Sequence, residues 1–147
     1  VIPVRRLQDA RPGLDPQTAG IYDPSENAIY IPEEVMSKGQ WTKNPDVMFE
    51  IRHEFGHAFN AKSHPFGDYI SDRPAFRDAF RKDMAKLTSE QLDELRLSPK
   101  FKSQVEARDE VFADMYAHST GYESNNPYSQ KMKAAFPSCL HYLSEDI

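Results

Sequence analysis

The segment His53-Glu54-Phe55-Gly56-His57 constrains the fold most strongly, because it fits the pattern H-E-x-x-H. On a helix, two histidines four positions apart lie on one face, one turn from each other. Their imidazoles can then bind the same zinc ion, and the intervening glutamate can hold the water that the metal acidifies. The pattern therefore predicts a helix in which His53 and His57 bind the metal and Glu54 is the catalytic base.

The flanking residues favour a helix over residues 45–62. Asn44 suits the N-cap, Pro45 suits the first helical position, and Asp46 complements the helix dipole. Gly56 costs about 1 kcal/mol in a helix relative to alanine, so we expect another backbone to come close there. Apolar residues recur at helical spacing and predict a buried stripe formed by Val47, Met48, Ile51, Phe55, Ala58 and Phe59.

A catalytic zinc site takes three protein ligands and leaves one position open. The extension of H-E-x-x-H by a glycine and a third histidine is absent, because Asn60 and Ser63 occupy those two positions. His64 is one residue late for that pattern. A carboxylate from a later helix is the remaining solution, and we predict Glu110 as the third ligand. The capping box that begins at Ser103 starts its helix, which we expect to continue to about residue 118.

Asp114 lies one turn after Glu110, on the same helical face. We expect it to accept a hydrogen bond from a ligand imidazole, which fixes the tautomer and raises the basicity of the ligand. Asp109 and Asp114 are also the rival ligands. Asp109 points about 100° away from Glu110 around the helix, so both cannot easily face the metal. The structural alternative is that all three acids form a solvated face.

The segments before the motif helix predict a small sheet. Residues 19–22 and 28–31 are two short β runs around a turn-forming segment, which indicates a hairpin. We expect a short strand in residues 1–7, a loop in residues 8–18, and a short helix in residues 32–36. A loop that contains Trp41 would then lead into the motif helix.

The segments after the motif helix predict mostly helices. We expect residues 63–67 to end the motif helix, and further helices to cover residues 74–87, 88–95, 103–118, 128–136 and 138–144. The expected fold class is therefore α+β: a small sheet with an N-terminal hairpin packed on the H-E-x-x-H helix, followed by a mostly helical C-terminal half.

Length and composition predict a single domain over residues 1–147. The net charge of −5 argues against non-specific nucleic-acid binding. No apolar run reaches the roughly 20 residues of a membrane span. The single cysteine, Cys139, excludes an internal disulfide framework, and we expect it to pack as a small apolar residue. Because residue 1 is valine, we expect a processed chain or a piece of a longer protein.

The two motif helices resemble those of the gluzincin metallopeptidases. His53–His57 and Glu110–Asp114 match the thermolysin-type pattern, in which an acid follows the glutamate ligand by four residues. The chain is more closely similar to the catalytic domain of the anthrax lethal factor family, which includes the Pro-Pro endopeptidases. That family has a similar H-E-F-G-H-A segment and a ligand helix E-x-E-F-F-A-E-A-F, close to Arg108–Tyr116 here. Its Gly-x-Tyr-Asp-Pro hairpin resembles Gly20–Pro24.

The resemblance, which covers about residues 20–120, implies a compact zincin-like endopeptidase with one Zn²⁺ per chain. A protein or peptide would be the substrate, and the relatives are secreted toxins or proteases. An effector that is secreted or delivered into a target cell is therefore the preferred interpretation. A regulatory metalloprotease that cleaves a transcriptional repressor stays open, as does a non-catalytic, metal-bound binding module.

The resemblance also implies a substrate-binding edge strand and a tyrosine that stabilises the oxyanion. We expect the substrate to add to the hairpin edge at Ala28, Ile29, Tyr30 and Ile31, with plain scaffold as an equal alternative. In the family the tyrosine lies shortly before the ligand helix, where this chain has none. Tyr69 is the only tyrosine between His57 and Glu110, and is the candidate, with packing as the alternative role.

Overall fold

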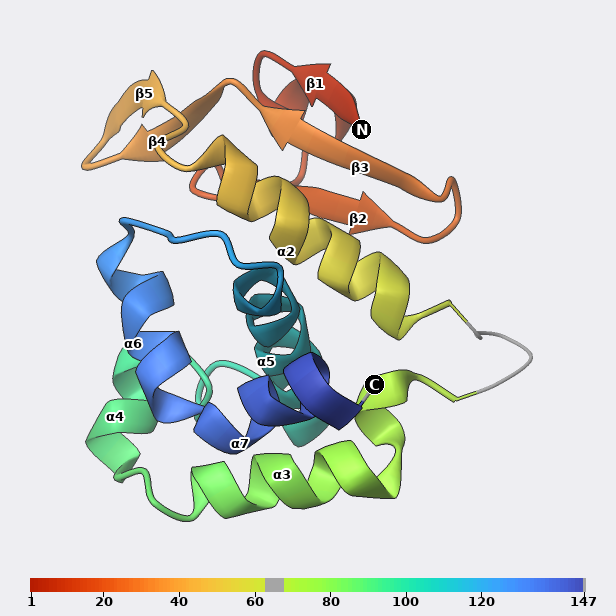
Figure 1. The fold of residues 1–147 in the computed structure, drawn as a ribbon. Coiled ribbons are helices and arrows are strands. Elements are labelled where there is room, and N and C mark those ends of the chain that lie inside the picture. Colours follow the sequence, from red (N-terminus) through yellow and green to blue (C-terminus); the bar gives the residue numbers. More distant parts are fainter. Residues whose placement is uncertain (63–67, 147) are drawn as a thin grey trace.

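A layer of short strands lies on one side of a long helix, α2, and a group of helices lies on the other side (Figure 1). The computed structural model describes residues 1–62 and 68–146. The expected end of the motif helix in residues 63–67, with His64, lies outside the described residues. The coarse expectation of an α+β fold with a small sheet and several helices is confirmed.

Three strands form the main sheet in the order β1-β3-β2. The central strand, β3 (Ala28–Pro32), pairs in parallel with β1 (Ile2–Val4) and antiparallel with β2 (Ile21–Asp23). The predicted hairpin of β2 and β3 is therefore confirmed. Part of the expected loop between β1 and β2 is instead a short helix, α1 (Leu7–Ala10).

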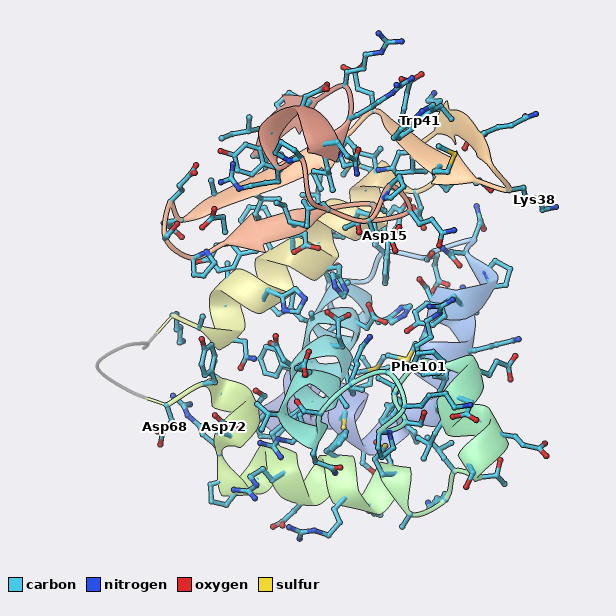
Figure 2. The ribbon with its side chains drawn as sticks, turned by 180° about the vertical axis from the view of Figure 1, so that it is seen from behind. Asp15, Lys38, Trp41, Asp68, Asp72 and Phe101 are labelled. Atoms are coloured by element: carbon cyan, nitrogen blue, oxygen red, sulfur yellow. The ribbon has the colours of Figure 1, made fainter. Side chains whose placement is uncertain are left out.

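A second, two-stranded sheet replaces the short helix and the loop expected over residues 32–43. Its strands are β4 (Glu34–Ser37) and β5 (Gln40–Lys43), which pair antiparallel. Lys38 and Gly39 have φ values of 51° and 78°, as a two-residue hairpin turn with the right twist requires. Figure 2 shows Lys38 and Trp41 of this hairpin at one end of the strand layer.

Helix α2 (Val47–Asn60) is the motif helix, and it begins two residues later than Pro45. Asn44 does not cap it. Its side-chain amide donates instead to the backbone carbonyls of Ala19 and Pro32, at 3.1 and 3.0 Å. The predicted N-cap is wrong because the Asn44 side chain links the segment before β2 to the last residue of β3.

The apolar stripe predicted for α2 is wrong in part. The side chains of Met48 and Phe55 are 50% and 47% exposed. The helix lies between the sheet and the C-terminal helices, and mostly polar residues occupy its buried face. The buried residues of α2 are Phe49, His53, Glu54, Gly56 and Asn60.

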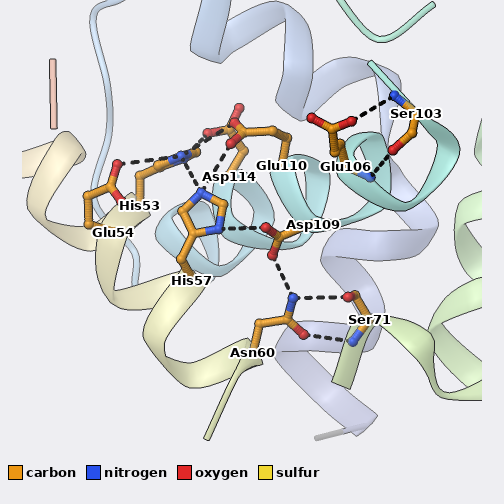
Figure 3. Close-up of polar contacts among 10 residues, drawn as sticks. All are labelled: His53, Glu54, His57, Asn60, Ser71, Ser103, Glu106, Asp109, Glu110 and Asp114. Atoms are coloured by element: carbon orange, nitrogen blue, oxygen red, sulfur yellow. Dashed lines mark hydrogen bonds and ion pairs between the residues drawn. The ribbon is translucent and has the colours of Figure 1, made fainter. Parts of the chain in front are cut away.

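Helix α5 (Gln104–Ser119) packs along α2, and the capping box of Ser103 and Glu106 starts it as predicted. A Cβ atom at Gly56 would lie 2.8 Å from both the Cα and the carbonyl oxygen of Ala113. The expected close approach of a second backbone at Gly56 is therefore confirmed. The approach places one face of α5 directly opposite the motif histidines (Figure 3).

The remaining helices surround α5 and bury a core of aromatic and aliphatic side chains, Cys139 among them. The remaining helices are η1 (Ile70–Asp72), α3 (Pro74–Met84), α4 (Ser89–Glu94), α6 (Pro127–Ala135), α7 (Pro137–His141) and η2 (Tyr142–Asp146). No helix in the described ranges is long and apolar enough to cross a membrane.

Candidate metal centre

Three potential metal ligands converge where α2 meets α5. The Nε2 atoms of His53 and His57 lie 3.1 Å apart. The carboxylate of Glu110 lies 3.1 Å from Nε2 of His57 and 3.5 Å from Nε2 of His53 (Figure 3). One donor atom from each residue falls within 4.8 Å of the others, although 53 residues separate His57 from Glu110. The structure thus brings together the three residues predicted as ligands.

The spacing of these donors fits a tetrahedral metal. Ligand atoms about 2.0–2.1 Å from a zinc ion are about 3.3 Å from one another along a tetrahedron edge. The two Nε2 atoms lie 3.1 Å apart, Oε1 of Glu110 lies 3.1 Å from His57, and Oε2 of Glu110 lies 3.5 Å from His53, so each pair of residues is close to that value. Two imidazoles and one carboxylate are also a donor set that suits zinc. The residues present therefore fit the ion that the sequence pattern implies.

The outer nitrogen of His53 is held by Asp114. Nδ1 of His53 lies 2.5 Å from Oδ1 of Asp114, and both side chains are buried. When Nδ1 donates its proton to this carboxylate, the lone pair of Nε2 faces the other donors. The contact is the one expected for Asp114, which is thus neither a ligand nor part of a solvated face.

Asp109 holds the outer nitrogen of His57, a role that was not predicted from the sequence. Its Oδ2 lies 3.2 Å from Nδ1 of His57, and its Oδ1 accepts a 2.7 Å hydrogen bond from Asn60. The buried Asn60 amide is fixed in turn by Ser71, whose hydroxyl accepts from it at 2.9 Å and whose backbone N–H donates to it at 2.7 Å. Asp109 does turn away from the donors as expected, but it turns toward the second ligand histidine.

The carboxylates around the histidines determine their protonation. Burial lowers the pKa of both imidazoles, but Asp114 and Glu110 raise the pKa of His53 well above its usual value. Asp109 and Glu110 likewise raise the pKa of His57 to about 9. Burial raises the pKa of Glu110, yet the two histidines lower it to about 2. A cation at this position would replace the imidazole protons, because histidine binds metals in its neutral form.

Glu54 is buried beside the donors, with Oε1 4.0 Å from Nε2 of His53. The backbone amide of Tyr22 lowers the pKa of the Glu54 carboxylate, against the larger effect of burial. A Cβ atom at Gly20 would lie 3.3 Å from Cγ of Glu54, so the start of β2 lies directly against this side chain. Burial raises the pKa of Glu54, which makes its carboxylate a stronger base near neutral pH.

Two cavities open on either side of the donors, and Thr18, Gly20, Glu54 and Glu110 line both. We call the larger one, of about 390 Å³, the His57-side cavity; its other lining residues are Ile21, Tyr22, Pro24, His57, Ala61, Tyr69 and Asp109. We call the smaller one, of about 250 Å³, the His53-side cavity; its other lining residues are Ala19, Phe49, Glu50, His53, Asp114, Asn126, Tyr128 and Ser129.

The hairpin residues predicted to bind substrate lie inside the sheet. Ala28, Ile29, Tyr30 and Ile31 belong to the central strand β3, which is hydrogen-bonded to β2 on one side and to β1 on the other. The prediction of a free edge there is wrong, because β2 is the outer strand beside the cavities and supplies the lining residues. A sequence pattern identifies the hairpin but does not say which of its strands is outermost.

The two candidate tyrosines lie in different cavities. Tyr69, the predicted oxyanion residue, lines the His57-side cavity together with Glu54 and Glu110. Tyr128, which the sequence analysis did not consider for the site, lines the His53-side cavity, and its hydroxyl donates to the carbonyl of Leu95 at 2.9 Å. Glu54 and Glu110 line both cavities, and Tyr69 stays the candidate for the oxyanion role.

In comparisons with known proteins, no family model matches the chain, and no curated protein or solved structure matches it at a significant level. The resemblance to gluzincins and to the lethal factor family therefore stays a prediction. The function has to be argued from the chemistry of the donors and of the two cavities beside them.

Proposed function

We propose that this protein is a zinc-dependent endopeptidase of the gluzincin type with a zincin-like fold. The observation that carries the proposal is the convergence of two imidazoles and a carboxylate, with donor atoms within 4.8 Å of one another, beside a buried glutamate and an accessible cavity. Catalytic zinc sites combine three protein ligands with a position open to solvent. His53, His57 and Glu110 would be the ligands, and the cavities would give access to the fourth position.

A zinc ion bound by these three residues would acidify a water molecule and polarise the carbonyl of the scissile bond. Glu54 accepts the proton of the attacking water and passes it to the leaving amine. Tyr69, on the wall of the His57-side cavity, is proposed to stabilise the oxyanion.

The substrate is proposed to bind as an added strand along β2. One side of β2 pairs with β3, and Gly20, Ile21 and Tyr22 line the His57-side cavity. An extended peptide on that edge would form main-chain hydrogen bonds and lie next to Glu54. The proposed edge strand is therefore β2 instead of β3, and the binding mode, addition of the substrate as a strand, stays the same.

The sequence leaves two other functions open. A non-catalytic metal-binding module does not require a buried glutamate beside the donors, whereas Glu54 is 5% exposed and its Oε1 lies 4.0 Å from Nε2 of His53. A regulatory protease that cleaves a repressor uses the same chemistry and differs only in its substrate. The role of a secreted toxin or effector is a proposal based on the resemblance.

The substitution Glu54→Gln tests the proposal. It keeps the shape of the side chain but removes the base, so we expect peptide hydrolysis to fall by about 10²–10⁴-fold. Zinc content should stay at one ion per chain, because Glu54 is not a ligand. Cleavage of a diverse peptide library, read by mass spectrometry with and without a chelator, measures the activity. The matched control is Glu33→Gln, an exposed acid outside both cavities. Activity that survives either Glu54→Gln or the chelator would contradict the mechanism.

A further inference from the structure

The His53-side cavity contains a carboxylate that the proposed mechanism does not use. Four acids line this cavity: Glu50, Glu54, Glu110 and Asp114. Asp114 and Glu110 contact the histidines, and Oε1 of Glu54 lies 4.0 Å from Nε2 of His53. The Glu50 carboxylate alone among the four makes no hydrogen bond or ion pair within the described part of the chain.

The environment of Glu50 does not compensate its charge. None of the described residues that line the cavity is a lysine or an arginine. Burial raises the pKa of Glu50 to about 7, and the negative charges of Asp114, Glu54 and Asp46 add to this effect, although His53 opposes it. Glu50 is half-buried, and a carboxylate that has lost part of its hydration without gaining a partner is unfavourable. A positive charge that entered the cavity would therefore be stabilised there.

The walls of the cavity suit a long side chain with a charged end. Phe49 and Tyr128 supply aromatic surface, and the Tyr128 ring is fixed by its hydrogen bond to Leu95. Aromatic rings contact both the methylene groups and the charged end of lysine or arginine favourably. The volume of about 250 Å³ is below the roughly 300 Å³ at which small-molecule sites begin. The cavity thus fits one side chain better than a whole small molecule.

The cavity is continuous with the proposed catalytic residues. It shares Glu54 and Glu110 with the His57-side cavity, and each of the two adjoining cavities is lined by one of the two histidines. A peptide that crosses the donors would put side chains from the two sides of the scissile bond into the two cavities. This step rests on the proposed function.

We propose that the His53-side cavity is a specificity subsite in which Glu50 binds the positively charged side chain of a substrate lysine or arginine. The substrate class is therefore a peptide with a basic residue close to the scissile bond. The amino group at a peptide's N-terminus offers similar chemistry, and the test separates it from a side chain.

Cleavage of an N-acetylated peptide library tests the subsite. We expect the wild-type protein to favour lysine or arginine over norleucine or citrulline by at least tenfold at one position near the cut. Glu50→Gln should reduce this ratio to below threefold, and Glu50→Lys should favour glutamate at the same position. Glu90→Gln, an exposed acid on α4, is the control and should keep the wild-type ratio. A ratio unchanged in Glu50→Gln, or a basic preference found only with free N-termini, overturns the proposal.

A binding measurement separates failure of the subsite from failure of the proposed function. The inactive Glu54→Gln variant is titrated with Nα-acetyl-lysine methylamide and followed by NMR, through the Glu50 carboxyl ¹³C resonance and through backbone amide resonances, which also report binding in Glu54→Gln/Glu50→Gln. We expect a saturable shift that the norleucine analogue does not cause, and a loss of binding at least fivefold in Glu54→Gln/Glu50→Gln. Binding of this kind without any peptide hydrolysis by the wild type would refute only the protease. Hydrolysis without this binding would refute only the subsite. Circular dichroism of each variant verifies that it folds.

Discussion

At the scale of single residues, each of the two motif histidines makes contacts through both ring nitrogens. Nε2 faces the shared donor cluster, and Nδ1 faces a carboxylate, Asp114 for His53 and Asp109 for His57. Asp109 is held in place by a further contact, because it accepts a hydrogen bond from the buried Asn60. Carboxylate partners fix the tautomer of a ligand histidine and raise its basicity. Asp109 and Asn60 are therefore positioning residues for His57.

Removal of Asp109 should weaken zinc binding. In Asp109→Ala, Nδ1 of His57 loses its acceptor, and we expect zinc affinity to fall by about 10–100-fold. Asp109→Asn should recover part of this loss, because its amide oxygen can still accept from Nδ1. Competition with a chromophoric chelator measures affinity, and ¹⁵N NMR of the imidazoles reports the tautomer of His57.

Asp78→Asn, at an exposed acid on α3, is the control and should bind zinc like the wild type. If Asp109→Ala kept both its zinc affinity and the wild-type tautomer, Asp109 would have no positioning role.

At the scale of elements, the contact between α2 and α5 positions the site. His53, Glu54 and His57 come from α2, and Glu110 and both supporting aspartates come from α5. The helices can approach closely because Gly56 lies against the backbone of Ala113. Helical spacing explains how the candidate ligands are arranged within each helix. The contact between α2 and α5 determines the distance from His53 and His57 to Glu110.

A methyl group at Gly56 should therefore disturb both packing and metal binding. The new Cβ atom in Gly56→Ala would lie 2.8 Å from backbone atoms of Ala113, so α5 would have to shift. We expect a net loss of about 1–3 kcal/mol in the free energy of unfolding, despite the gain of roughly 1 kcal/mol in helix propensity. Urea unfolding and zinc titration measure the two effects.

Gly13→Ala is the matched control, because nothing lies within 4 Å of a Cβ atom at Gly13. Its stability and zinc affinity should equal those of the wild type. A Gly56→Ala protein as stable as this control would show that the close approach is not required.

At the scale of the whole molecule, the site lies between the strand layer and the C-terminal helices (Figure 1). Strand β2 contacts the site through Tyr22 and Gly20, and the segment after α5 supplies Tyr128 to the His53-side cavity. Tyr122 and Ser124 of this same segment donate hydrogen bonds to Asp46 at the start of α2. A metal held by α2 and α5 would join these parts further.

Zinc should stabilise the folded protein measurably. Free zinc at 100 times its Kd should add about 2.7 kcal/mol to the free energy of unfolding, which corresponds to a rise in Tm of roughly 5–10 °C for a chain of this size. Scanning calorimetry in zinc buffers and in chelator measures the shift. His57→Ala should abolish most of it, and magnesium should not replace zinc. An equal Tm with zinc and with chelator would argue against a metal site at these residues.

The sequence by itself determined the features that depend on local spacing. Four-residue spacing places His53 and His57 on one helical face, and the capping box at Ser103 starts the helix that carries Glu110. These predictions succeed because hydrogen bonds within a helix join residues only a few positions apart. The β2–β3 hairpin was predictable for the same reason, since a short turn connects its strands.

Only the tertiary structure decided which segments meet. The strand order makes β2 rather than Ala28–Ile31 the strand beside the site, and the packing of α2 on α5 turns Asp109 toward His57. The same packing exposes Met48 and Phe55 and encloses Glu50 in a cavity. The periodicity of apolar residues indicates that a side chain faces inward, but it does not identify the residue that this side chain contacts. The contacted residue comes from a distant part of the chain, and its position depends on how helices and strands pack together.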